Sequence, residues 1–190
     1  INSLKELEEI KDNELNTILS RLPNIPHKSV PFGKNENDNI KYREWGNKPD
    51  FSFKPKVHYE IGENLGLINF ELASKLSGSR FVVLKKQISK LERAISNFML
   101  DKHTEENGYI EYSLPFLVKN ESLYGTGQLP KFGEDLFTAG DDHWLIPTAE
   151  VPLTNLVRNE ILNINQLPIR STSYTPCFRS EAGAAGKDTR

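Results

Sequence analysis

Residues 141–155 read DDHWLIPTAEVPLTN, and the stretch from Trp144 to Val151 predicts a strand. Successive side chains of a strand point to opposite faces of a sheet, so Ile146, Thr148 and Glu150 would share one face. That face would carry a hydroxyl and a carboxylate where the core of an ordinary domain is apolar. The stretch therefore predicts a polar binding surface on a sheet.

A second stretch, residues 176–183, reads PCFRSEAG. As a strand it would place Arg179 on the same face as Thr175 and Cys177, so Glu150 and Arg179 could lie on one sheet surface. Such a pair suits a substrate ammonium at Glu150 and a phosphate at Arg179, because the guanidinium offers a planar fork of donors that fits phosphate oxygens. A purely structural ion pair explains the same spacing, and the residues alone leave both interpretations open.

Five further stretches match the pattern of one known family. Residues 125–132 read GTGQLPKF, and the other four are SGSRF at 77–81, LERA at 91–94, NFMLD at 97–101 and GY at 108–109. Together with the two stretches above, they make the chain resemble the seryl-tRNA synthetases, a group of class II aminoacyl-tRNA synthetases. The resemblance covers nearly the whole chain. GTGQLPKF and the Thr-Ala-Glu triplet favour seryl enzymes, whereas an Arg-x-Glu turn fits many class II members.

The resemblance implies a function and a set of site residues. In this family serine and ATP give seryl-adenylate and pyrophosphate, and the seryl group then passes to the 3′ end of tRNA(Ser). L-serine would be bound by Thr148, Ala149 and Glu150. The ATP-binding turn would consist of Arg179, Ser180 and Glu181. Within this turn the resemblance makes Arg179 and Glu181 the catalytic residues, with Arg179 on the α-phosphate and Glu181 near the adenine amino group.

The resemblance also implies a cofactor and a partner subunit. Mg²⁺ would accompany ATP, because phosphoryl oxygens need a counter-charge during transfer, and no metal ligand is expected within this chain. Pro115 matches the proline of the family's first signature, which builds the dimer interface. A homodimer is therefore expected for the full enzyme, and an ordinary helix–strand unit of a single core is the alternative.

The middle of the chain predicts alternating strands and helices. Residues 81–84 and 109–114 predict strands, and Asn107-Gly108 supplies a C-terminal stop for the helix between them. The apolar face of that helix, which would reach about His103, consists of Ile88, Leu91, Ile95, Phe98 and Met99. With the segments around Thr148 and Arg179, the pattern predicts an α+β fold in which helices flank an antiparallel sheet.

The chain divides into three predicted parts. Residues 1–22 predict an amphipathic helix that ends before Pro23, since apolar residues recur there at helical spacing: Leu4, Leu7, Ile10, Leu15, Ile18 and Leu22. By resemblance it is the end of the N-terminal coiled-coil arm that binds tRNA, and a helix that merely packs on the domain is the alternative. Residues 23–56, with several prolines and asparagines, predict a linker. Residues 57–190 would be the N-terminal part of the class II catalytic domain.

The composition is that of an ordinary globular protein. Among 190 residues, 24 are Lys or Arg and 26 are Asp or Glu, so a net charge of −2 gives no general attraction to polyanions. Any contact with tRNA must therefore be local. The single cysteine cannot form an intramolecular disulfide, and no apolar stretch approaches the about 20 residues needed to span a bilayer. We therefore expect a cytoplasmic protein with no membrane partner.

The ends of the chain suggest a piece of a longer enzyme. It begins with Ile1 rather than methionine and stops at Arg190, inside the loop of the second signature. We therefore expect a catalytic domain truncated within that signature, which alone does not form seryl-adenylate. Two alternatives remain: a non-catalytic, synthetase-like module for dimerisation or RNA binding, and a ligase that charges a carrier protein instead of tRNA.

Overall fold

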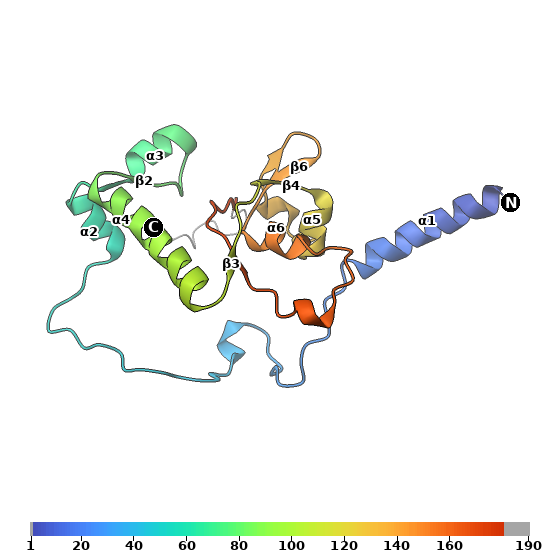
Figure 1. Ribbon diagram of the computed structural model, residues 1–190, viewed down its shortest axis with the longest axis horizontal. Helices are drawn as coiled ribbons and strands as arrows, with labels where there is room; N and C mark the ends of the chain where they lie inside the picture. Colours follow the sequence, from blue (N-terminus) through green and yellow to red (C-terminus); the bar gives the residue numbers. More distant parts are fainter. Residues whose placement is uncertain (1, 181–190) are drawn as a thin grey trace. The chain divides into compact units, whose positions relative to one another are not determined.

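The computed structural model describes residues 2–180, and the chain forms two compact units, Ile1–Pro55 and Lys56–Arg190 (Figure 1). The first unit contains one long helix and an extended segment. The second unit contains the remaining α-helices and all the strands of the described chain. Within residues 2–180, no helix combines the length and the apolar character needed to cross a membrane.

The first unit begins with helix α1, Asn2–Leu19. The predicted amphipathic helix is thus confirmed, although it ends at Leu19 rather than at about residue 22. Beyond Leu19 the backbone tightens: the N–H of Arg21 donates to the Ile18 carbonyl at 3.1 Å and that of Leu22 to the Leu19 carbonyl at 3.2 Å. These shorter turns end the helix before Pro23, which disfavours helix in the preceding residue.

The rest of the first unit, residues 20–55, contains one short 3₁₀ helix, Glu36–Asp38. Its start is fixed by a capping box, in which the Asn35 side chain accepts from the Asn37 N–H at 3.0 Å and the Asp38 carboxylate accepts from the Asn35 N–H at 3.4 Å. No residue from 3 to 55 is buried. Residues 3–55 therefore form no hydrophobic core of their own, and the role of this unit as the end of an arm plus a linker stays a prediction.

The second unit opens with two helices and a short hairpin-like pair of strands. They are α2 (His58–Asn64), β1 (Ile68–Asn69), α3 (Phe70–Ser77) and β2 (Val83–Leu84). β1 and β2 pair antiparallel, and the Asn69 side chain caps α3 by accepting from the Leu72 N–H at 2.6 Å. The strand predicted over residues 81–84 forms only at Val83–Leu84, because its pairing partner, β1, is only two residues long.

Gly62 provides a test of the packing between α2 and β1. A Cβ atom at this buried position would lie 2.3 Å from Ile68 Cδ1, 2.5 Å from its Cγ1 and 3.1 Å from its Cβ, so a rotation of the isoleucine tip cannot remove the overlap. Overpacking of this kind costs about 1–3 kcal/mol, against about 1 kcal/mol of helix propensity gained by alanine over glycine.

We therefore expect Gly62→Ala to lower the thermal unfolding midpoint of the native gene product. Gly133→Ala is the matched control, because its added Cβ would meet only Leu129 Cδ2, at an ordinary 3.4 Å. Equal midpoints for the two variants would show that Gly62 does not approach Ile68 in the way described.

Helix α4, Gln87–Asp101, confirms the helix predicted for this region. It continues through one π-helical turn, Lys102–Glu106, and stops at Asn107 and Gly108, where Gly108 adopts a φ of 68°. The predicted stop is therefore confirmed. The apolar face of α4 is largely solvent-accessible, with exposed fractions of 54% for Leu91, 43% for Ile95, 65% for Phe98 and 56% for Met99.

The remaining strands form two more small sheets. β3 (Ile110–Glu111) pairs with β7 (Ser171–Thr172) in parallel, and β4 (Leu117–Lys119), β6 (His143–Leu145) and β5 (Thr138–Ala139) form an antiparallel sheet in that order. The α+β class is confirmed, with helices beside mainly antiparallel pairs. The structure adds one parallel pair, β3 with β7, to the predicted antiparallel arrangement.

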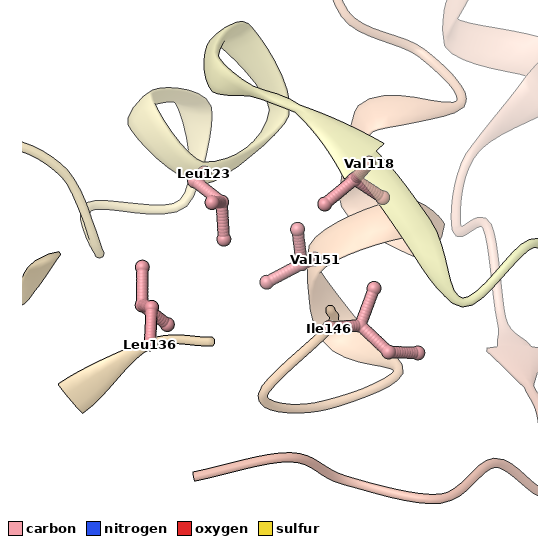
Figure 2. Packing of buried hydrophobic residues seen from close by; sticks show 5 residues of the cluster. All are labelled: Val118, Leu123, Leu136, Ile146 and Val151. Carbon is pink, nitrogen blue, oxygen red and sulfur yellow. The ribbon is translucent and has the colours of Figure 1, made fainter. Parts of the chain in front are cut away.

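The main core lies between this antiparallel sheet and two short helices, α5 (Asn120–Gly125) and α6 (Glu150–Asn155). Figure 2 shows its five buried side chains, which are Val118, Leu123, Leu136, Ile146 and Val151. Leu129 and Trp144 pack against them. The helices are also joined by the Asn155 side chain, whose Nδ2 donates to the Ser122 carbonyl at 2.8 Å. The core therefore fixes the two segments, around residues 136 and 146, that surround the candidate site.

The strand predicted from Trp144 to Val151 is wrong beyond Leu145. β6 ends there, and helix α6 begins at Glu150. Pro147 explains the break, because it has no N–H to continue the pairing. Glu150 suits the first helical turn, where a carboxylate interacts favourably with the helix dipole. The expected alternation of side chains therefore does not extend to Thr148 and Glu150.

Candidate functional site

Arg179 is held by the segment that links β6 to α6. The N–H of Phe178 donates to the carbonyl of Ile146 at 2.9 Å, and the Nε of Arg179 donates to the carbonyl of Pro147 at 3.0 Å. Ile146 and Pro147 are both buried. Hydrogen bonds to buried residues therefore hold both the main chain next to Arg179, at Phe178, and the side chain of Arg179 itself. Residues 173–180 nevertheless form no strand.

Ser180 attaches the same segment to a second loop. Its N–H donates to the Asp135 carbonyl at 3.0 Å, and its hydroxyl donates to the Glu134 carbonyl at 2.7 Å. These carbonyls belong to a 3₁₀ turn, Gly133–Asp135, that immediately precedes the buried Leu136. The segment around Arg179 is therefore fixed against two loops that both connect to the core.

Thr148 and Arg179 line one pocket of about 260 Å³. The remaining lining residues are Gln128, Phe132, Asp135, Leu136 and Pro147. Thr148 is half-buried, whereas Arg179 is exposed. A hydroxyl and a guanidinium facing one small pocket can bind a compact ligand that carries both a hydrogen-bonding group and an anionic group.

Glu150 lies apart from this pocket. It lines a larger hollow of about 820 Å³, together with the β3 and β7 segments and residues of α6 such as Leu153 and Thr154. In the described part of the chain no ion pair joins Glu150 to Arg179. The shared sheet face predicted for these two residues is therefore wrong, because the chain turns into α6 before it reaches Glu150.

The other predicted site residues differ in what the structure shows. Ala149 precedes α6 and contributes its carbonyl, which accepts from the Leu153 N–H at 3.1 Å. Pro115 is exposed, next to β4. Glu181 lies outside the described residues. The serine-binding and ATP-binding roles of the predicted residues, and the interface role of Pro115, stay predictions.

The lining residues to which the sequence assigned no role include Gln128, Phe132, Asp135 and Leu136. The first two belong to the GTGQLPKF stretch, which served only as a family marker, so that stretch was the signal that pointed toward the site. Asp135 and the neighbouring Glu134 had no such signal. Their carbonyls make the contacts with Ser180, and a backbone carbonyl leaves no pattern in a single sequence.

Comparisons with known proteins give one consistent result. Residues 136–190 match the family model described as the tRNA synthetase class II core domain (G, H, P, S and T). The serine–tRNA ligase of Rhizobium rhizogenes is 59% identical over 186 residues, which are 98% of this chain and 44% of that protein. The serine–tRNA ligase of Ehrlichia ruminantium is 60% identical over 94% of this chain and 42% of its own length.

Two solved structures share the fold. The seryl-tRNA synthetase of Pyrococcus horikoshii, complexed with ATP, gives a TM-score of 0.85 at 39% identity over 97% of this chain and 46% of that chain. The cytoplasmic serine–tRNA ligase of Naegleria fowleri, in complex with AMP, gives 0.84 at 31% identity over 99% and 45%. The resemblance to seryl-tRNA synthetases is therefore confirmed, and the chain spans less than half the length of the curated relatives it matches.

Proposed function

We propose that this chain is part of a serine–tRNA ligase, which activates L-serine with ATP and transfers the seryl group to the 3′ end of tRNA(Ser). The observation that carries the proposal is the joint position of Thr148 and Arg179 in one pocket of about 260 Å³. Both residues match the expected site of the seryl enzymes. The identity of 59% to a serine–tRNA ligase over 98% of the chain supports the choice of amino acid.

Arg179 is proposed to act in the first half-reaction. A carboxylate oxygen of serine attacks the α-phosphorus of ATP, the new O–P bond forms, and the bond to the leaving pyrophosphate breaks. Negative charge accumulates on the α-phosphate oxygens during this step. Because only the Nε of Arg179 donates to Pro147, its two terminal nitrogens can donate to those oxygens and stabilise the transition state.

Thr148 is the best-placed candidate for holding serine. Its half-buried hydroxyl lies in the same pocket as Arg179 and can accept a hydrogen bond from the substrate ammonium. Such a contact would orient the serine carboxylate toward the α-phosphate, and orientation of this kind supplies a large part of catalysis in adenylation. Glu150 and the backbone at Ala149 are proposed to complete the serine site from the start of α6.

Mg²⁺ is proposed to enter with ATP rather than in a protein-held site. Within residues 2–180, no group of three or more His, Cys, Asp or Glu side chains could hold a metal ion. Asp135 is the single carboxylate among the lining residues of the pocket. Mg²⁺ commonly binds through one or two carboxylates together with substrate phosphates, so we propose that it arrives as MgATP.

We further propose that the full enzyme is a cytoplasmic homodimer. The exposed apolar face of α4 and the exposed Pro115 leave the predicted interface available to a second copy. A chain with one cysteine suits a reducing compartment. The same exposed face is what favours the alternative, a non-catalytic module that only dimerises.

The test of the proposed function is ATP–pyrophosphate exchange by the native gene product. We expect exchange that requires L-serine and that is nearly absent with alanine or threonine at the same concentration. Alanine lacks the hydroxyl and threonine adds a methyl group, so the two controls test both polarity and size. A pure, folded product with no exchange would reject the ligase and favour the non-catalytic module.

A further inference from the structure

Ser180, which follows the proposed catalytic Arg179, makes two hydrogen bonds to one turn. Its N–H and its hydroxyl donate to two consecutive carbonyls, those of Asp135 and Glu134, at 3.0 and 2.7 Å. The second distance is typical of a good O–H···O hydrogen bond. Because the hydroxyl donates its single hydrogen to Glu134, it is engaged within the protein.

The turn that accepts these bonds is itself fixed. The N–H of Asp135 donates to the Phe132 carbonyl at 3.1 Å, and that of Leu136 donates to the Gly133 carbonyl at 3.2 Å. Leu136 is buried in the main core (Figure 2). The hydroxyl of Ser180 therefore connects the chain beside Arg179 to a turn that cannot shift without disturbing the core.

Arg179 needs this connection because its own side chain is long. An arginine side chain has many rotamers, and all but one must be disfavoured for the guanidinium to stay in one position. The Pro147 carbonyl fixes the Nε, and the Ile146 carbonyl fixes the backbone before Arg179 through Phe178. The two hydrogen bonds of Ser180 fix the backbone that directly follows Arg179.

We propose that Ser180 is a positioning residue: its hydroxyl, bound to the Glu134 carbonyl, holds Arg179 in the orientation in which the guanidinium lines the pocket beside Thr148. This inference rests on the proposed function. It gives Ser180 a role through Arg179 and the 3₁₀ turn, and not through a direct contact with ATP.

The experiment measures kcat and KM for serine-dependent ATP–pyrophosphate exchange in the native gene product and its Ser180→Ala and Ser180→Thr variants. We expect Ser180→Ala to lower kcat about 10-fold, since small misplacements of catalytic groups are costly, with both KM values nearly unchanged. Ser180→Thr keeps the hydroxyl and should restore kcat. Ser20→Ala is the matched control, because it removes a hydroxyl-to-carbonyl bond, to Thr17, in the separate first unit.

The outcomes separate the possible roles. An unchanged kcat in Ser180→Ala would overturn the inference, and so would a Ser180→Thr variant as slow as Ser180→Ala. A rise in the KM for ATP alone would also overturn it, because it would indicate direct contact with the nucleotide. If Ser180→Ala fails to fold, Ser180→Cys replaces it: the thiol is a weak donor, so kcat should still fall. Absence of exchange in the unmodified protein would instead reject the proposed function.

Discussion

Replacement of Arg179 by alanine is expected to lower kcat/KM for serine-dependent ATP–pyrophosphate exchange by about 10²–10³, the cost of removing one well-placed donor from a charged transition state. The guanidinium lines the pocket beside Thr148 and keeps its two terminal nitrogens available, because its Nε is bound to the Pro147 carbonyl. Steady-state exchange with serine and ATP varied separately would measure the loss. Most of it should appear in kcat, since in the proposed reaction the negative charge that Arg179 would stabilise develops in the transition state.

Two companion variants make this result specific. Arg179→Lys keeps the positive charge but lacks the planar fork and the Nε that binds Pro147, so most of the loss should remain. Arg158→Ala removes an arginine whose Nη1 contacts Ser122 Oγ at 3.4 Å and Asn155 Oδ1 at 3.3 Å, away from the pocket, and it should leave exchange nearly unchanged. Similar losses in Arg179→Ala and Arg158→Ala would contradict a specific role for Arg179.

The helices were predictable because their signals are local. α1 and α4 each carry an apolar stripe at helical spacing, and the stop at Asn107-Gly108 is a residue preference that needs no tertiary contact. The strands were less predictable, since each pairs over only two or three residues, and all except β5 pair with a strand that is distant in the sequence. The parallel pairing of β3 with β7 depends on the path of the chain between these two strands, and no local residue pattern predicts that path.

The site was only partly predictable, because some of its contacts also join residues that are distant in the sequence. The family pattern identified both Thr148 and Arg179, and the structure brings them together. Strand alternation placed Glu150 on their face, but Pro147 ends the strand and the start of α6 moves Glu150 into another hollow. Contacts of Arg179 with Pro147 and of Ser180 with Glu134 join residues 32 and 46 positions apart, through carbonyl groups that every residue has.

The largest expected effect on folding comes from Leu123→Ala. Leu123 is fully buried between α5, α6 and the antiparallel sheet, and its neighbours in the core come from four other segments (Figure 2). Truncation of a buried leucine costs about 2–5 kcal/mol, through lost burial and the cavity that remains. Urea unfolding of the native gene product should show a clearly lower midpoint for this variant. Leu4→Ala is the matched control, because Leu4 is 69% exposed and should leave the midpoint nearly unchanged.

This variant also distinguishes loss of folding from loss of chemistry. The Leu123 carbonyl accepts from the N–H groups of Gln128 and Leu129 at 3.0 and 3.3 Å, so the core at Leu123 supports the turn that brings Gln128 to the pocket. We expect Leu123→Ala to retain exchange at low temperature and lose it on warming, as the folded fraction falls. Arg179→Ala should lose exchange at every temperature with an unchanged unfolding midpoint. A Leu123→Ala variant with wild-type stability would contradict the central position of Leu123 in the core.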